Sequence, residues 1–156
     1  LTTVGPEGTD ASPRGDVDPV VQIADAKTLL LPDWRGNNRL DCLRNIVADG
    51  RVSLMFMVPG SLNVVRVNGR AVLTADPTVT GSFEQRGKHP KTVIVLTVDE
   101  VYFQCAKALM RSGLWTRGDD SAGLPTAGQF TKEMDPGFDA EGYDLSYPEE
   151  APKRMW

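Results

Sequence analysis

The sequence from Arg51 to Leu73 alternates apolar and polar residues on both sides of a Pro59-Gly60 pair. Every second residue from Val52 to Val58 is apolar, and the stretch from Val65 to Leu73 largely continues the pattern with arginines and an asparagine between. A period of two predicts strands with one apolar face, and the Pro-Gly pair predicts a turn between them. A long β hairpin therefore constrains the fold more than any other feature of the chain.

Short extended segments surround this hairpin, at residues 1–4, 9–13, 20–24, 28–31 and 92–98. The last is apolar on both faces, which is typical of a central strand. A helix is predicted after Asn38 as its N-cap, with Leu43 and Ile46 on its apolar face and Gly50 beyond its end. Further helical segments are expected within residues 76–85 and over residues 104–112. Because Leu1 reads as mid-strand, we also expect an element to precede it.

Composition limits the classes of function. The 156 residues are 40% hydrophobic and carry a formal net charge of -4 with no long basic run, which favours one globular core and argues against a nucleic-acid partner. No apolar run is long enough to span a bilayer, so we expect a soluble, cytoplasmic protein without membrane contact. His89 is the only histidine, which argues against zinc sites and histidine-dependent triads. Cys42 and Cys105 are expected to be buried reduced thiols.

The loop before the predicted helix concentrates groups that bind phosphate. It contains Arg35, Asn37, Asn38 and Arg39. Free backbone N–H groups and the positive end of the dipole at a helix start favour an anion, and arginine supplies several donors in a rigid fork. One interpretation is a site for a phosphate-bearing cofactor. The alternative is an N-capped helix with solvated arginines.

Separated motifs in one order resemble a known family. They are Ser12-Pro13-Arg14-Gly15-Asp16, the stretch Leu-Leu-Pro-Asp-Trp-Arg-Gly-Asn-Asn-Arg-Leu ending at Leu40, and Cys105-Ala-Lys-Ala-Leu-Met-Arg-Ser-Gly-Leu-Trp115. Residues 1–116 resemble the FMN-binding split-barrel superfamily of pyridoxamine 5'-phosphate oxidase, and more narrowly a bacterial subgroup of predicted flavin-nucleotide-binding proteins. The resemblance implies a mainly β fold, a six-stranded antiparallel split barrel. It also implies a homodimer in which both subunits build each FMN site.

The resemblance assigns roles position by position. The phosphate-binding pattern falls on Asn37, Asn38 and Arg39, reinforced by Arg35, and the two flavin contacts at the preceding strand end fall on Pro32 and Asp33. The strand along the flavin ring corresponds to Ser12, Pro13, Arg14, Gly15 and Asp16, with Arg14 as the ring contact. Val64 occupies the position of a flavin-binding glutamine, and the closing Trp-Arg-Leu-x-Pro motif is absent. Oxidation of pyridoxine phosphate is therefore not expected.

Two basic groups outside the loop have competing interpretations. Lys107, Arg111 and Trp115 are spaced to share one helical face, so two cations and an aromatic ring can converge on a flavin or its substrate. Alternatively, this face is solvated and Trp115 packs on the barrel. Arg66 and Arg70 point away from the apolar side of the hairpin and are expected in solvent or at a subunit contact.

Residues 117–156 differ in amino-acid composition from the predicted barrel. Seven acidic and no basic residues lie between Glu133 and Glu150, yet the segment contains aromatic residues, which argues against full disorder. We expect it to dock on the barrel or on the dimer partner. For the whole chain, the main functional hypothesis is an FMN-dependent oxidoreductase acting on an unknown small molecule. The alternatives are a non-catalytic flavin carrier or redox sensor, or the same fold with a deazaflavin or haem.

Overall fold

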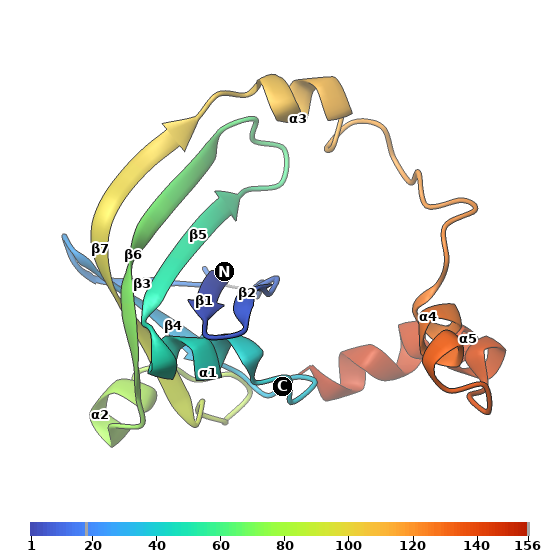
Figure 1. Ribbon diagram of the computed structural model, residues 1–156, viewed down its shortest axis with the longest axis horizontal. Coiled ribbons are helices and arrows are strands. Elements are labelled where there is room, and N and C mark those ends of the chain that lie inside the picture. The colour runs from blue at the N-terminus through green and yellow to red at the C-terminus, as the bar shows by residue number, and fades with distance from the viewer. Residues whose placement is uncertain (18, 156) are drawn as a thin grey trace. The chain divides into compact units, whose positions relative to one another are not determined.

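The computed structural model describes residues 1–17 and 19–155, and the chain divides into two compact units, Leu1–Trp115 and Thr116–Trp156 (Figure 1). The strands of the first unit are β1 (Thr2–Gly5), β2 (Gly8–Ala11), β3 (Gln22–Asp25), β4 (Thr28–Asp33), β5 (Arg51–Met57), β6 (Val64–Thr74) and β7 (Thr92–Gln104). Its helices are α1 (Asp41–Ala48), α2 (Pro77–Thr80) and α3 (Lys107–Ser112).

The strands form one antiparallel sheet in the order β2-β1-β5-β6-β7-β4-β3. The prediction of a mainly β, antiparallel fold with short helices, as in the split barrel, is confirmed. The predicted number of strands is wrong, because the sheet in the described residues has seven strands and not six. The seven strands fall on the seven extended segments expected from the sequence, whereas the number six was implied by the family resemblance.

Alternation in the sequence produces the core of the first unit. Val52 and Leu54 of β5 pack with Val67 of β6, and α1 adds Ile46 to the same cluster. The remaining members of the cluster are Leu31, Ala71, Ile94 and Leu96. The predicted hairpin is confirmed, since β5 and β6 pair in register from Arg51↔Arg70 to Met57↔Val64.

Gly69 lies at an irregularity in the pairing of β6 with β7. The pairing shifts by one residue between Asn68 and Gly69, which marks a bulge. A Cβ atom at Gly69 would lie 2.1 Å from the backbone oxygen of Thr97. Only glycine fits this approach, and bulges of this kind bend the strand that carries them. Figure 1 shows β6 and β7 curving along their length.

Three predicted element boundaries are wrong. Helix α1 starts at Asp41 with Leu40 at its N-cap, and Asn38 instead adopts a left-handed φ of 60°, which asparagine tolerates better than most residues. Strand β7 continues to Gln104 because its aromatic and β-branched residues pair with β6 along its whole length. As a result, Cys105 precedes α3 and is exposed, whereas Cys42 is buried as expected.

The arginines of the hairpin are not simply solvated. The guanidinium of Arg66 lies over the Tyr102 ring, 5.2 Å from its centroid. Arg70 Nη1 donates to the backbone oxygen of Asp49 over 3.3 Å. Both side chains therefore make contacts within the chain, between neighbouring strands or to the end of α1.

Asp49 and Arg51 join the end of α1 to the start of β5. Arg51 Nε donates to Asp49 Oδ1 over 2.7 Å, and this hydrogen bond is the largest cause that lowers the pKa of the Asp49 carboxyl from 3.8 to about 2. Because the folded-state pKa is the lower one, the pair stabilises the fold above pH 3.8, and this contribution is lost as the pH falls through about 2.

We expect Arg51→Gln to raise the Asp49 pKa towards 3.8, although the backbone N–H of residue 51, which also bonds Asp49, will keep part of the shift. NMR titration of the carboxyl carbons measures this change. Asp25 is the internal control, since its pKa is lowered chiefly by the backbone N–H of Lys27. An Asp49 pKa that stays near 2 in the variant would contradict the assignment.

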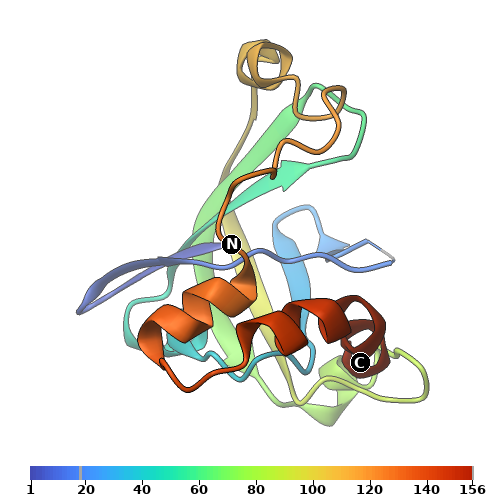
Figure 2. The same cartoon turned by 90° about the vertical axis from the view of Figure 1, so that its right-hand side faces the viewer.

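The second unit is a small helical hairpin of α4 (Ala127–Met134) and α5 (Ala140–Glu150), followed by the 3-10 helix η1 (Ala151–Arg154) (Figure 2). Thr126 and Gln129 form a capping box at the start of α4, and Asp144 of α5 accepts a hydrogen bond from the Gly128 N–H. Gly128 cannot carry a Cβ atom without meeting Ala140. In the described part of this unit, Ala140 is the only buried hydrophobic residue, so the hairpin has almost no core of its own.

Candidate functional site

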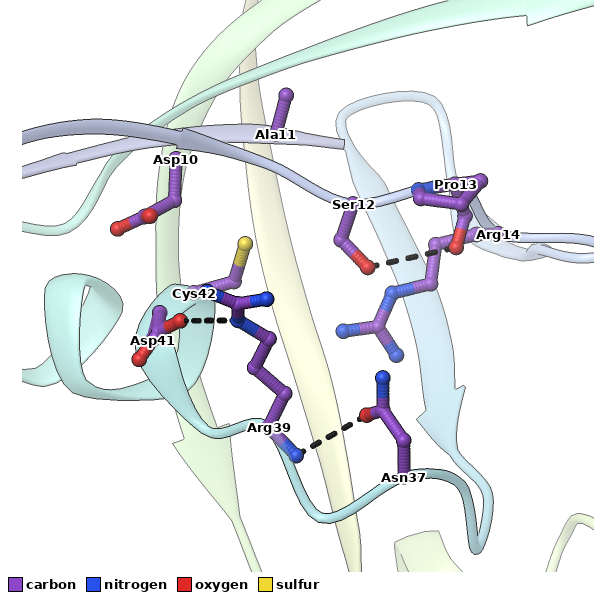
Figure 3. A pocket seen from close by; sticks show the side chains of 9 residues that line it. All are labelled: Asp10, Ala11, Ser12, Pro13, Arg14, Asn37, Arg39, Asp41 and Cys42. Atoms are coloured by element: carbon purple, nitrogen blue, oxygen red, sulfur yellow. Dashed lines mark hydrogen bonds and ion pairs between the residues drawn. The ribbon is translucent and has the colours of Figure 1, made fainter. Parts of the chain in front are cut away.

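A cavity of about 390 Å³ lies between the end of β2 with the segment that follows it and the segment that leads into α1 (Figure 3). This volume falls within the range of roughly 300 to 1,000 Å³ that is usual for small-molecule sites. Its lining residues are Asp10, Ala11, Ser12, Pro13, Arg14, Asn37, Arg39, Asp41 and Cys42. The structure thus brings together Ser12, Pro13 and Arg14 with Asn37 and Arg39, which are separated in sequence.

Hydrogen-bond donors converge on this cavity. Asn37 Oδ1 accepts the backbone N–H of Arg39 over 3.0 Å, which leaves the Asn37 amide nitrogen facing the cavity. In Figure 3 this nitrogen and the guanidinium of Arg14 point toward one another. Two donors that face each other cannot satisfy one another, so the space between them suits a hydrogen-bond acceptor.

Arg14 is fixed by an ion pair at the end of β4. Its Nη1 donates to Asp33 Oδ1 over 2.9 Å, and the two side chains are 24% and 22% exposed. The Nε of Arg14 is buried and has no hydrogen-bond partner in residues 1–17 and 19–155. A buried donor without a partner costs about 1–3 kcal/mol, so an acceptor atom of a ligand at Nε would stabilise this arrangement of Arg14.

Arg39 and Asp41 form the second ion pair of the cavity. Arg39 Nε donates to Asp41 Oδ2 over 2.8 Å, and this bond raises the pKa of the guanidinium. The terminal nitrogens of Arg39 are left for a ligand, because the pair occupies only Nε. The carboxylate of Asp41 reduces the positive charge of the cavity, so Arg39 is exposed but not an unopposed cation.

Asn45 holds the two walls of the cavity together. From α1, its amide nitrogen donates to Asp10 Oδ2 over 2.6 Å and to Thr3 Oγ1 over 3.2 Å. A Cβ atom at Gly5 would lie 1.9 Å from Asn45 Oδ1, so the hairpin turn passes directly against this side chain. Asp10 thereby has a structural partner, and α1 is fastened to the β1–β2 hairpin.

Other predicted site residues lie outside the cavity lining. Arg35, Asn38 and Gly15 are exposed, and Pro32 is half-buried within β4, where it pairs with Val93. Asp16 faces a different loop, since its Oδ1 accepts from Gln85 Nε2 over 3.3 Å. Asp33 reaches the cavity only through Arg14.

The group on α3 also lies apart from the cavity within one chain. Helix α3 ends at Ser112, where Gly113 is left-handed, so Trp115 is beyond the helix and does not share a helical face with Lys107 and Arg111. The expectation of one shared face is therefore wrong. Both cations are exposed, and Figure 1 shows α3 at the opposite end of the long strands from α1.

Trp115 contacts the turn between β5 and β6. Its Nε1 donates to the backbone oxygen of Ser61 over 2.8 Å. We expect Trp115→Phe, which keeps the ring but removes this donor, to lower the free energy of unfolding by about 0.5–1.5 kcal/mol. Urea denaturation measures this loss. Unchanged stability would show that the bond contributes nothing and would leave Trp115 available for another role.

Several residues at the site were not predicted from the sequence. Asp10, Ala11 and Cys42 line the cavity, and Asp41 was predicted only as a helix residue. Trp34 directly follows β4, and its Nε1 is buried without a partner among the described residues. Trp34 is not among the residues that line the cavity, and the lining residues that the sequence missed come together through strand pairing and helix packing.

Metal and membrane features are not found in the described chain. No group of three or more histidine, cysteine, aspartate or glutamate residues in residues 1–17 and 19–155 could hold a metal ion. His89 is exposed, and its Nδ1 lies 2.6 Å from the Phe83 backbone oxygen. None of the described helices is both long and apolar enough to cross a bilayer.

Comparison with known proteins agrees with the fold. The family model described as "Pyridoxamine 5'-phosphate oxidase" matches residues 1–105. The crystal structure of HupZ from Group A Streptococcus is 18% identical, with a TM-score of 0.54 over 67% of this chain and 82% of that one. A single-residue variant of HupZ is 20% identical, with a TM-score of 0.52 over 66% and 86%. No curated protein matched the chain.

Proposed function

Because this chain belongs to the pyridoxamine 5'-phosphate oxidase family, we propose that it is a flavoprotein whose cavity binds FMN. The observation that carries the proposal is the convergence of Arg14, Asn37 and Arg39 on one cavity, with the buried Nε of Arg14 lacking an acceptor in the described chain. This donor set suits an anionic ligand that also offers carbonyl oxygens.

The phosphate of FMN would lie against Asn37 and Arg39. Both line the cavity, and α1 begins at the next residues without a side-chain cap, so the N–H groups of its first turn are available to an anion. Arg35 and Asn38 stay as predicted phosphate contacts. Asp41 would lie beside the phosphate and compete with it for the charge of Arg39, whose Nε it holds.

The flavin ring would lie along the segment from Ser12 to Arg14. Arg14 offers its unpaired Nε, and the Ser12 hydroxyl lies 3.4 Å from the backbone oxygen of Pro13, a weak bond that a ligand can replace. Gly15, Asp16 and Pro32 stay as predicted contacts on this side, and Asp33 is the ion-pair partner of Arg14. When bound, FMN supplies hydride-transfer chemistry, and the protein supplies binding, orientation and electrostatics.

We propose an FMN-dependent oxidoreductase acting on a small molecule whose identity is open. The test is a titration of the purified protein with FMN and with riboflavin, followed by flavin fluorescence. Preferential binding of FMN supports the phosphate assignment, and equal affinities would contradict it.

An absorption spectrum of the purified protein, with mass identification of any bound ligand, separates the cofactor alternatives. A flavin spectrum supports the proposal, whereas a deazaflavin or a haem would replace it. Haem receives little support from His89, which is not among the residues that line the cavity. Reoxidation of the reduced flavin by candidate acceptors then separates an oxidoreductase from a carrier or redox sensor.

We also propose that the protein is a homodimer with FMN at the subunit interface. An apolar strip on β6 and β7 supports this, because Val65 pairs with Phe103, which is 76% exposed, and Val101 beside it is 59% exposed. Such strips mark association surfaces. A dimer would also allow α3 of one subunit, with Lys107, Arg111 and Trp115, to approach the cavity of the other.

Light scattering is expected to give the mass of a dimer, and Phe103→Asp is expected to shift the mass towards that of a monomer. Val17→Asp is a control, because Val17 is 81% exposed and is not on this strip. A wild-type monomer that binds FMN tightly would contradict the interface assignment. Docking of residues 117–156 on the barrel or the partner stays a prediction, favoured by the near absence of a core in that unit.

A further inference from the structure

We infer that Asp33 is a positioning residue: it does not bind the flavin itself but holds Arg14 so that the buried Nε of Arg14 is presented to the ligand. This inference rests on the proposed FMN site. It differs from the assignment implied by the family resemblance, in which the residue at position 33 touches the flavin directly.

The ion pair joins a residue of the sheet to a residue outside it. Arg14 follows β2 in an irregular segment, whereas Asp33 is the last residue of β4, where it pairs with Thr92 of β7. The carboxylate is therefore fixed by the sheet and the guanidinium is not. The 2.9 Å contact from Arg14 Nη1 to Asp33 Oδ1 therefore restrains the position of the guanidinium relative to β4.

The ion pair is largely shielded from solvent and leaves the Arg14 Nε unpaired. Both side chains are about three-quarters buried, so the pair is shielded from much of the water that would weaken it. The bond to Asp33 uses Nη1, and Nε remains buried without a partner in the described chain. Because the guanidinium is planar, fixing Nη1 also fixes the direction of the Nε–H bond.

Arg14 lines the cavity and Asp33 does not. A negative carboxylate in direct contact with an anionic cofactor would be unfavourable, whereas the same carboxylate behind an arginine orders the donor. Asp33 is thus placed to act through Arg14.

A double-mutant cycle in the full-length protein tests this inference. FMN affinity is measured for the wild type, Arg14→Ala, Asp33→Asn and the double variant. We expect Arg14→Ala to weaken FMN about tenfold or more, Asp33→Asn to weaken it about threefold to tenfold, and Asp33→Asn to have no further effect once Arg14 is removed. Asp25→Asn, which removes a carboxylate on the neighbouring strand β3, is the control and should bind FMN as the wild type does.

Additive effects of the two substitutions, or wild-type affinity of Asp33→Asn, would overturn the inference. A second readout does not need the flavin: the NMR signal of the Arg14 Nε–H in the apoprotein should be protected from exchange in the wild type and lost in Asp33→Asn. A signal that persists in the variant would also overturn it. Failure of the wild type to bind FMN would count against the proposed function alone, because the apoprotein signal still decides whether Asp33 orders Arg14.

Discussion

Leu96→Ala is expected to lower the free energy of unfolding by about 2–5 kcal/mol, enough to remove a large share of the stability of a small domain. Leu96 is fully buried, and its strand β7 lies between β4 and β6, where it pairs with Leu29 and Ala71. The cost combines the lost burial of the side chain with the cavity left behind, because paired strands on both sides limit how far the site can collapse.

Urea or thermal denaturation of the apoprotein measures this loss. Val72→Ala is the matched control, since Val72 is on the adjacent strand β6 but is 63% exposed, and its substitution should cost less than about 1 kcal/mol. Similar losses for both variants would show that the described core does not determine the stability of the barrel.

The sheet was predictable where local pattern and tertiary environment agree. Alternation from Val52 to Leu54 and again at Val67 is the direct consequence of one buried face, and these residues are in the core. The end of β7 was not predictable in this way, because residues 99–104 are mostly exposed and are strand only through pairing with β6. The N-cap of α1 was missed for a similar reason: Asn38 has the right residue type, but its φ of 60° belongs to the loop and not to the helix start.

The candidate site was predictable where a motif is contiguous in sequence. Ser12, Pro13 and Arg14 line the cavity, and so do Asn37 and Arg39, although Asn38 between them does not. The partner of Arg14 was not predictable, because Asp33 is 19 residues away at the end of β4. Asp41 is only two residues from Arg39, but their ion pair depends on how the loop before α1 folds. The sequence motifs therefore identified the hydrogen-bond donors of the site, whereas the ion pairs that hold the two arginines are seen only in the structure.

Arg39→Ala is expected to weaken FMN binding about tenfold or more, because a charge-assisted hydrogen bond contributes about 1.5–3 kcal/mol and each 1.4 kcal/mol is tenfold in affinity. Riboflavin affinity should hardly change, since riboflavin lacks the phosphate that Arg39 is proposed to bind. Arg44→Ala is the matched control: Arg44 is an exposed arginine on α1, outside the cavity lining, and its loss changes the net charge equally.

Asp41→Asn is expected to act in the opposite direction and tighten FMN binding. The carboxylate of Asp41 holds Arg39 Nε over 2.8 Å and places a negative charge in the cavity lining, so its removal both frees the guanidinium and relieves repulsion of a phosphate. Combining Asp41→Asn with Arg39→Ala shows whether the effect of the Asp41 carboxylate depends on Arg39. If Arg39 binds the phosphate, Asp41→Asn should lose most of its benefit in the Arg39→Ala background, and fluorescence titration at two ionic strengths should show the benefit shrinking with salt. Weaker FMN binding by Asp41→Asn alone would mean that Asp41 orients Arg39 more than it competes for it.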